Sequence, residues 1–197
     1  MPYNGWTNRA TWNASMEFDS DSYFQELIGD TIEEVLEDVS MGRRVSLEYL
    51  RDAIESALAG RIEELSETAE SCHEDNIFSA VESMSPQEAY EYGKAQGDED
   101  INYQEIVETA FMNHRLWFAS CKFRGENYTV AAMSEDDAVD RLCEALNDED
   151  SELDFAKSDK NMVSDEESGE TLTVRTDSWD VSFDSDDAEQ PNPQPGM

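Results

Sequence analysis

Hydrophobic residues in the first half of the chain recur every three or four positions, which is the spacing of one face of an α-helix. Stripes of this kind predict four helices, over residues 22–40, 46–68, 75–84 and 101–113. Ser46 is a favourable N-cap for the second of them. Gly42 and the two arginines that follow it suit the end of the first, because a glycine and cations stabilise a helix C-terminus.

Two short motifs mark further helix starts. Residues 85–88, Ser-Pro-Gln-Glu, place a capping serine before a proline at the first helical position, with a glutamate three residues after the cap. Near the N-terminus, Thr7 or Asn8 is expected to cap a short helix on which Trp12 and Met16 share one face. Both motifs extend the helical pattern of this half of the chain.

The spacing changes to alternation after residue 114, which is the pattern of a β-strand with one buried face. Alternating apolar residues predict a hairpin with strands near residues 117–123 and 128–132. Gly125 lies between them and suits a type II′ turn, because glycine adopts the positive φ angle that the first central position needs. This part of the chain is therefore expected to begin with an antiparallel strand pair.

A helix and a second hairpin are predicted after this pair. Ser134 begins an amphipathic helical pattern, whereas the acidic residues 148–169 show so little periodicity that they predict a long loop. The second hairpin is expected to turn at residues 176–178. Residues 184–197 combine acidic side chains with prolines and are predicted to be disordered.

These elements predict an α+β fold, with a helical N-terminal half followed by a small β-β-α-β-β half. The expected domain boundaries follow from the change in pattern. Residues 1–114 are expected to form a helical domain, residues 115–183 a small α+β domain, and residues 184–197 an acidic, proline-rich tail.

The N-terminal motif also resembles a known group of proteins. Residues 4–13 read Asn-Gly-Trp-Thr-Asn-Arg-Ala-Thr-Trp-Asn. This motif is similar to the start of small uncharacterised proteins of bacteriophages, haloarchaea and haloarchaeal viruses, in which the aromatic residues stand in fixed register. The resemblance covers residues 4–18 and implies a viral or mobile-element protein. It implies no activity, cofactor or site residue, because none is established for the group.

The net charge is the feature of this sequence that bears most on its function. The 197 residues include 48 acidic and 13 basic side chains, for a formal net charge of −35. Soluble domains usually carry a net charge of about 2–8, since like charges repel in the compact state. A net charge of −35 matches the charge on roughly 60 Å of duplex DNA. The sequence therefore predicts a protein whose charge per unit length is comparable to that of DNA.

Many acidic residues recur three or four positions apart on the predicted helices. Such rows destabilise an isolated helix through like-charge repulsion, and a cationic partner would relieve it. We expect partner-binding carboxylates in two sets, along the two longest predicted helices and, for Glu70, two residues past the predicted end of the second: Glu26, Asp30, Glu33, Glu34, Glu37 and Asp38, then Glu48, Asp52, Glu55, Glu63, Glu67 and Glu70.

The leading hypothesis is an acidic DNA mimic that blocks the DNA-binding site of a basic host protein, such as a restriction or CRISPR-type defence nuclease. It describes an inhibitor that is not an enzyme, needs no cofactor and does not bind nucleic acid directly, because its own charge repels phosphates. One alternative is a halophile-adapted or generic acidic viral protein that acts as a protein–protein interaction module. Another is an adaptor in which Trp6 and Trp12 are exposed anchors.

Catalytic and metal-binding patterns are sparse. The two histidines and three cysteines have spacings that match neither a structural zinc site nor a disulfide framework. Acidic stretches at residues 19–21 and 148–150 lack the glycine and the final glutamate of an EF-hand, so no metal site is expected. No apolar stretch approaches about 18 residues and no secretory pattern is evident, so we expect a cytoplasmic protein without a membrane partner. No heptad pattern decides the oligomeric state.

Overall fold

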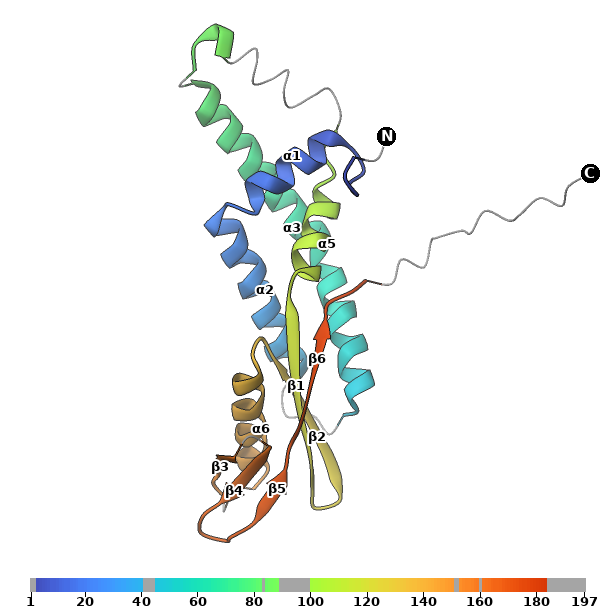
Figure 1. The fold of residues 1–197 in the computed structure, drawn as a ribbon, viewed down its shortest axis with the longest axis vertical. Coiled ribbons are helices and arrows are strands. Elements are labelled where there is room, and N and C mark those ends of the chain that lie inside the picture. The colour runs from blue at the N-terminus through green and yellow to red at the C-terminus, as the bar shows by residue number, and fades with distance from the viewer. Residues whose placement is uncertain are drawn as a thin grey trace, which may run out of the picture.

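Helices make up the first half of the molecule and antiparallel strands much of the second, which confirms the predicted α+β class (Figure 1). The computed structural model describes residues 3–40, 45–82, 84–88, 100–150, 153–159 and 161–183. The helices are α1 (Arg9–Phe18), α2 (Ser22–Ser40), α3 (Leu47–Glu82), α5 (Tyr103–Met112) and α6 (Glu135–Glu149). The strands are β1 (Arg115–Phe123), β2 (Glu126–Ala132), β3 (Phe155–Asp159), β4 (Met162–Asp165), β5 (Thr171–Thr173) and β6 (Arg175–Asp180). The predicted helix end at Gly42 and the predicted acidic tail lie outside the described residues.

Helix α1 begins after Asn8, one of the two predicted caps. The Asn8 Oδ1 accepts a hydrogen bond from the N–H of Thr11 at 2.8 Å, and its Nδ2 donates to the carbonyl of Asp100 at 2.8 Å. The hydroxyl of Thr11 in turn accepts from the N–H of Asn102 at 3.0 Å. Because Asn102 is itself the N-cap of α5, the N-terminal motif fastens α1 to the start of α5.

The aromatic residues of the same motif are half-buried. Trp6 packs against the helical core, and the ring centroid of Trp12 lies 5.1 Å from that of Tyr3. Met16, predicted to share a face with Trp12, is 53% exposed. The motif therefore contributes intramolecular packing as well as capping.

Helices α2 and α3 lie side by side and run in opposite directions (Figure 1). Leucine and isoleucine stripes on both helices are fully buried: Ile28, Ile32 and Leu36 on α2, and Leu50, Ile54 and Leu58 on α3. The prediction of separate helices over 46–68 and 75–84 is wrong, because α3 is one helix of 36 residues. Ala69 and His73 continue its buried stripe, and neither proline nor glycine interrupts the stretch between the two predicted segments.

The first sheet has the strand order β2-β1-β6 and lies between two hydrophobic cores. On one face, Leu116 and Phe118 of β1 join the core that α2, α3 and α5 form. On the other face, Ala119 and Cys121 belong to a second core, to which α6 contributes Leu142. The alternation along β1 thus supplies both cores, and the second sheet, in the order β3-β4-β5, borders the second one.

Three predictions for the C-terminal part are wrong. The hairpin around residues 176–178 does not form, because β6 runs through these residues and pairs with β1, whereas β5 pairs with β4. The predicted loop over 148–169 contains β3 and β4. Most side chains of β3 are exposed, so this strand lacks the apolar–polar alternation by which a strand is recognised in a sequence. The β1–β2 turn has positive φ at both Arg124 (50°) and Gly125 (91°), which is type I′ and not type II′.

Two further helix starts are confirmed. Ser134 caps α6 and accepts a hydrogen bond from the N–H of Asp137 at 3.1 Å. In the capping box, the N–H of Ser85 donates to the Glu88 carboxylate at 2.9 Å, and the N–H of Glu88 donates to the Ser85 hydroxyl at 3.4 Å. These local signals act over three residues, so the sequence alone is sufficient to locate them.

Asp165 closes the turn after β4 and carries a pH-dependent part of the stability. The residue is buried, and its carboxylate accepts from the N–H groups of Ser168 at 2.6 Å and Asp154 at 2.7 Å. Hydrogen bonds, first from the Ser168 side chain and then from these N–H groups, lower the pKa of Asp165. Because folding favours the charged form, this stabilisation is present at neutral pH and is lost as the pH falls below about 4 through the lowered pKa.

The variant Asp165→Asn is therefore expected to be less stable than the unmodified protein at pH 7, and the difference should narrow as the pH falls. An asparagine Nδ2 would face an N–H donor where the second carboxylate oxygen now accepts. Urea unfolding of both proteins between about pH 7 and pH 3 measures the difference in the free energy of unfolding. A difference that stays constant over this range would show that the Asp165 charge is not what the turn stabilises.

Candidate anionic interface

All twelve predicted carboxylates lie at the surface of α2 and α3. Ten of them are exposed, and Glu33 and Glu55 are half-buried. The six on α3 are spaced 4, 3, 8, 4 and 3 residues apart, which keeps them on one side of the helix. We name this set the α3 acidic row: Glu48, Asp52, Glu55, Glu63, Glu67 and Glu70. At 1.5 Å per residue the row extends over about 33 Å.

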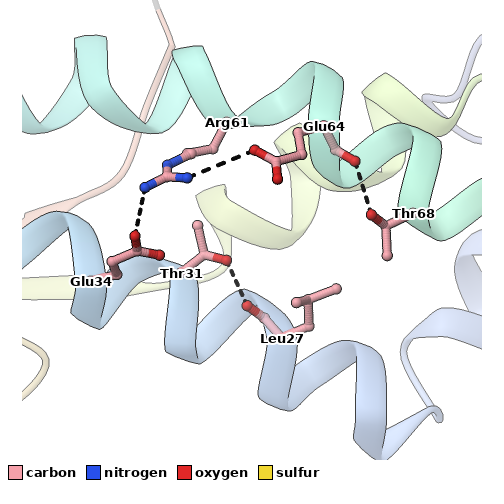
Figure 2. A network of polar contacts seen from close by, with 6 residues as sticks. All are labelled: Leu27, Thr31, Glu34, Arg61, Glu64 and Thr68. Atoms are coloured by element: carbon pink, nitrogen blue, oxygen red, sulfur yellow. Dashed lines mark hydrogen bonds and ion pairs between the residues drawn. The ribbon is translucent and has the colours of Figure 1, made fainter.

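The two arginines of α3 do not interrupt this row, because both bind carboxylates of the protein itself. Arg61 contacts Glu34 of α2 at 2.8 Å and Glu64 of α3 at 3.7 Å, as Figure 2 shows. Arg51 reaches Asp177 of β6 at 2.7 Å, and its guanidinium lies 5.3 Å from the ring centroid of Phe118. The cations of α3 are thus used to join α3 to α2 and to the sheet.

Two of the six predicted carboxylates on α2 form ion pairs with neighbouring helices. Glu33 forms an ion pair with Arg141 of α6, and Glu34 forms the pair with Arg61. These two join α2 to its neighbours. Glu26, Asp30 and Glu37 are exposed, and α2 contains no lysine or arginine. Glu33 lies between Asp30 and Glu37 on the same helical face, so its pairing with Arg141 of α6 interrupts the anionic strip on α2.

The structure does not bring the twelve carboxylates into one ridge. Glu33 faces α6, Glu34 faces α3, and the first half of the α3 acidic row borders β6. The two helices thus present anionic surface on different sides of the molecule. The longest straight array among the described residues is the α3 acidic row, which makes it the strongest candidate interface.

A groove beside α3 adds aromatic surface to this row. Two adjoining clefts of about 520 and 320 Å³ share Asp52 and Glu55, and the larger one is also lined by Glu48 and by the half-buried Arg51. Trp179 forms the other wall of the larger cleft and Phe183 that of the smaller. Carboxylates opposite aromatic faces suit lysine and arginine side chains, which gain both charge pairing and cation–π contact.

Sequence reasoning missed Trp179 and Phe183 as part of an interface, because the alternating residues that follow position 178 predicted only the second strand of a hairpin. The Trp179 ring packs 6.4 Å from Phe118, and the Phe183 ring packs 6.3 Å from Phe111. Each is half-buried, so one side of the ring supports the core while the rest borders the groove. The alternation in the sequence indicated burial, but it could not show that α3 stands opposite.

Polar contacts of His73 connect three helices of the helical half. His73 is 2% exposed; its Nδ1 lies 3.0 Å from the Tyr103 hydroxyl and its Nε2 3.2 Å from the Glu17 carboxylate. Burial, with the negative charges of Glu70, Glu74 and Glu17, raises the pKa of Tyr103 to about 12. These contacts of the buried His73 join α1, α3 and α5.

Two of the three cysteines, Cys121 and Cys143, are poor nucleophiles in this setting. Cys72, Cys121 and Cys143 are free thiols. Burial raises the pKa of both Cys121 and Cys143 to about 11, so both thiols are protonated at neutral pH. Across the described residues, no group of three or more His, Cys, Asp and Glu side chains is arranged to hold a metal ion.

The comparisons with known proteins add no family to these observations. No protein-family description matches the chain, and no curated protein or solved structure is significantly similar to it. Within the described residues, no helix combines the length and the apolar character needed to cross a membrane.

Proposed function

We propose that the protein is a DNA mimic, an acidic inhibitor that occupies the DNA-binding site of a basic host enzyme such as a restriction or CRISPR-type nuclease. The observation that carries the proposal is the α3 acidic row, which is long and straight and has five of its six carboxylates exposed. The mechanism is competition, in which the protein excludes the duplex from the site and performs no chemistry on a substrate.

The dimensions of the row support this proposal. Its length of about 33 Å is close to one helical turn of duplex DNA, which is about 34–36 Å. A cationic cleft that follows phosphates along one turn would therefore meet carboxylates over the same distance on α3. Because a single helix holds the row, the spacing of the charges is set before binding, which reduces the cost of ordering the interface.

Electrostatics supplies the driving force. Neighbouring carboxylates such as Glu63 and Glu67 repel each other at a spacing of four residues, and the free protein bears this cost. A partner's lysines and arginines would relieve the repulsion and release the counter-ions that both surfaces bind. The net charge of −35 would also steer the protein toward a cationic site and speed association.

Affinity capture tests the proposal. The full chain, immobilised, is exposed to host lysate, and bound proteins are eluted first with a duplex of about 20 base pairs and then with rising salt. We expect the duplex to release a DNA-binding enzyme, because both ligands need the same site. If the duplex releases nothing while salt does, the captured proteins bind through some other surface and the proposal fails.

The salt dependence of folding separates mimicry from the alternative of an interaction module adapted to high salt. A mimic must be folded in dilute buffer, where its interaction with a cationic site is strongest. We therefore expect circular dichroism to show native helix content at about 20 mM salt, with little gain in stability in molar salt. Unfolding in dilute buffer, with recovery only in molar salt, would favour salt adaptation.

A further inference from the structure

A cleft on the sheet, next to the start of the α3 acidic row but lined by none of its residues, has the opposite charge. It has a volume of about 790 Å³ and lies where the β2-β1-β6 sheet extends past the first turn of α3, beside β5. Lys122 of β1 and Arg175 of β6 line it, and its described lining residues include neither aspartate nor glutamate. The charged side chains among its described lining residues are therefore all cationic, in a chain with 48 acidic residues.

The strand register places the polar side chains of this cleft on one face of the sheet. Ser120 of β1 pairs with Thr129 of β2 on one side and with Arg175 of β6 on the other. Two residues further along β1, Lys122 pairs with Asn127. Since side chains two residues apart on a strand point the same way, these five form one continuous polar surface.

Three of these five side chains, Lys122, Asn127 and Arg175, are exposed, whereas Thr129 is buried. The Thr129 hydroxyl already donates to the carbonyl of Val45 at 3.0 Å, which fixes the chain just before α3. The Lys122 ammonium, the Arg175 guanidinium and the Asn127 amide are exposed donors. The N-terminus of α3, capped by Ser46, borders the same cleft and adds positive potential.

We propose that this cleft binds a phosphorylated small molecule of about nucleotide size. Arg175 and Lys122 are diagonal neighbours on the same face of the sheet, so a guanidinium and an ammonium can both reach one phosphate group between them. The volume lies within the range of about 300–1,000 Å³ that is typical of small-molecule sites and far exceeds one phosphate. Neutral donors and acceptors from the three strands and from β5 can contact the rest of such a ligand. The site is independent of the proposed function, because it shares no residue with the α3 acidic row.

Titration of the full, isotopically labelled chain with three probes tests the site, using AMP, inorganic phosphate and adenosine. At about 0.15 M salt the Debye length is about 8 Å, so distant carboxylates are largely screened. We expect saturable NMR shift changes with AMP, centred on Ser120, Lys122 and Arg175. Phosphate should bind at least tenfold more weakly than AMP, and adenosine should not saturate. Equal affinity for AMP and adenosine, or for AMP and phosphate, would overturn the proposal.

Single neutralisations identify the residues that hold the ligand. Lys122→Gln and Arg175→Gln should each weaken AMP binding about fivefold to tenfold, as expected for the loss of a charge-assisted hydrogen bond. Arg115→Gln is the matched control, because it removes a cation from β1 that pairs with Asp180 outside the cleft. AMP affinity that is unchanged in both cleft variants, or that falls equally in the control, would overturn the assignment.

Discussion

Replacing Phe118 with alanine is expected to destabilise the protein by about 3–5 kcal/mol, the usual cost of removing a fully buried phenylalanine. Phe118 is 1% exposed and lies where β1 meets the helical core. Its ring is within 6.4 Å of the Trp179 ring, and the Arg51 guanidinium lies 5.3 Å above it. The variant thus loses packing on both the sheet and α3, in a protein whose net charge already opposes compaction.

Urea unfolding monitored by circular dichroism measures this loss. Tyr23→Ala is the matched control, since Tyr23 is an aromatic residue of α2 that is 57% exposed, and its free energy of unfolding should change by less than about 0.5 kcal/mol. A cost below about 1 kcal/mol for Phe118→Ala would mean that the sheet does not pack on the helices in solution as it does in the structure.

The combined variant Glu63→Gln, Glu67→Gln and Glu70→Gln should weaken binding to a cationic partner by roughly 100-fold. This assumes about 1 kcal/mol for each carboxylate that meets a lysine or arginine. The folding stability of this variant should nevertheless increase. Removing repulsion between residues three and four apart is expected to raise the free energy of unfolding by about 0.5–1 kcal/mol. If these carboxylates instead stabilise the fold, the variant should be less stable than the unmodified protein.

A charge-matched control distinguishes the α3 acidic row from the effect of net charge. It removes an equal number of negative charges from exposed positions of α6, through Asp140→Asn, Glu144→Gln and Asp148→Asn. We expect this variant to change affinity by less than about fivefold, measured on the same captured partner. Equal losses in the two variants would show that total charge governs binding and that the row on α3 has no special part in it.

Neutralising Glu33, Glu34 and Glu37 would not test partner binding alone, because two of these carboxylates form ion pairs within the protein. Arg141 pairs with Glu33 and Arg61 pairs with Glu34, so their loss would loosen the contacts of α2 with α6 and α3. These partners lie 108 and 27 positions away along the chain. Helical spacing correctly placed the carboxylates at the surface, but pairing at such separations depends on tertiary structure.

The elements that the sequence predicted well are those with local causes. Asn8 and Ser134 cap their helices through bonds to residues three positions away, and the apolar stripe of α2 follows one periodicity throughout. The misplaced elements depend on distant partners. β6 pairs with β1, about 60 residues earlier in the chain, and not with its neighbour β5, so the alternation near residue 176 was assigned to the wrong partner.

Equilibrium competition on the purified partner enzyme tests DNA mimicry most directly. A fluorescently labelled duplex of about 20 base pairs is bound to the enzyme, and the protein is added to saturation at several salt concentrations. We predict complete displacement of the duplex at one protein per DNA site, with an inhibition constant that weakens as salt rises. A ternary complex, in which the duplex stays bound at saturating protein, would contradict the proposal that the acidic surface takes the place of DNA.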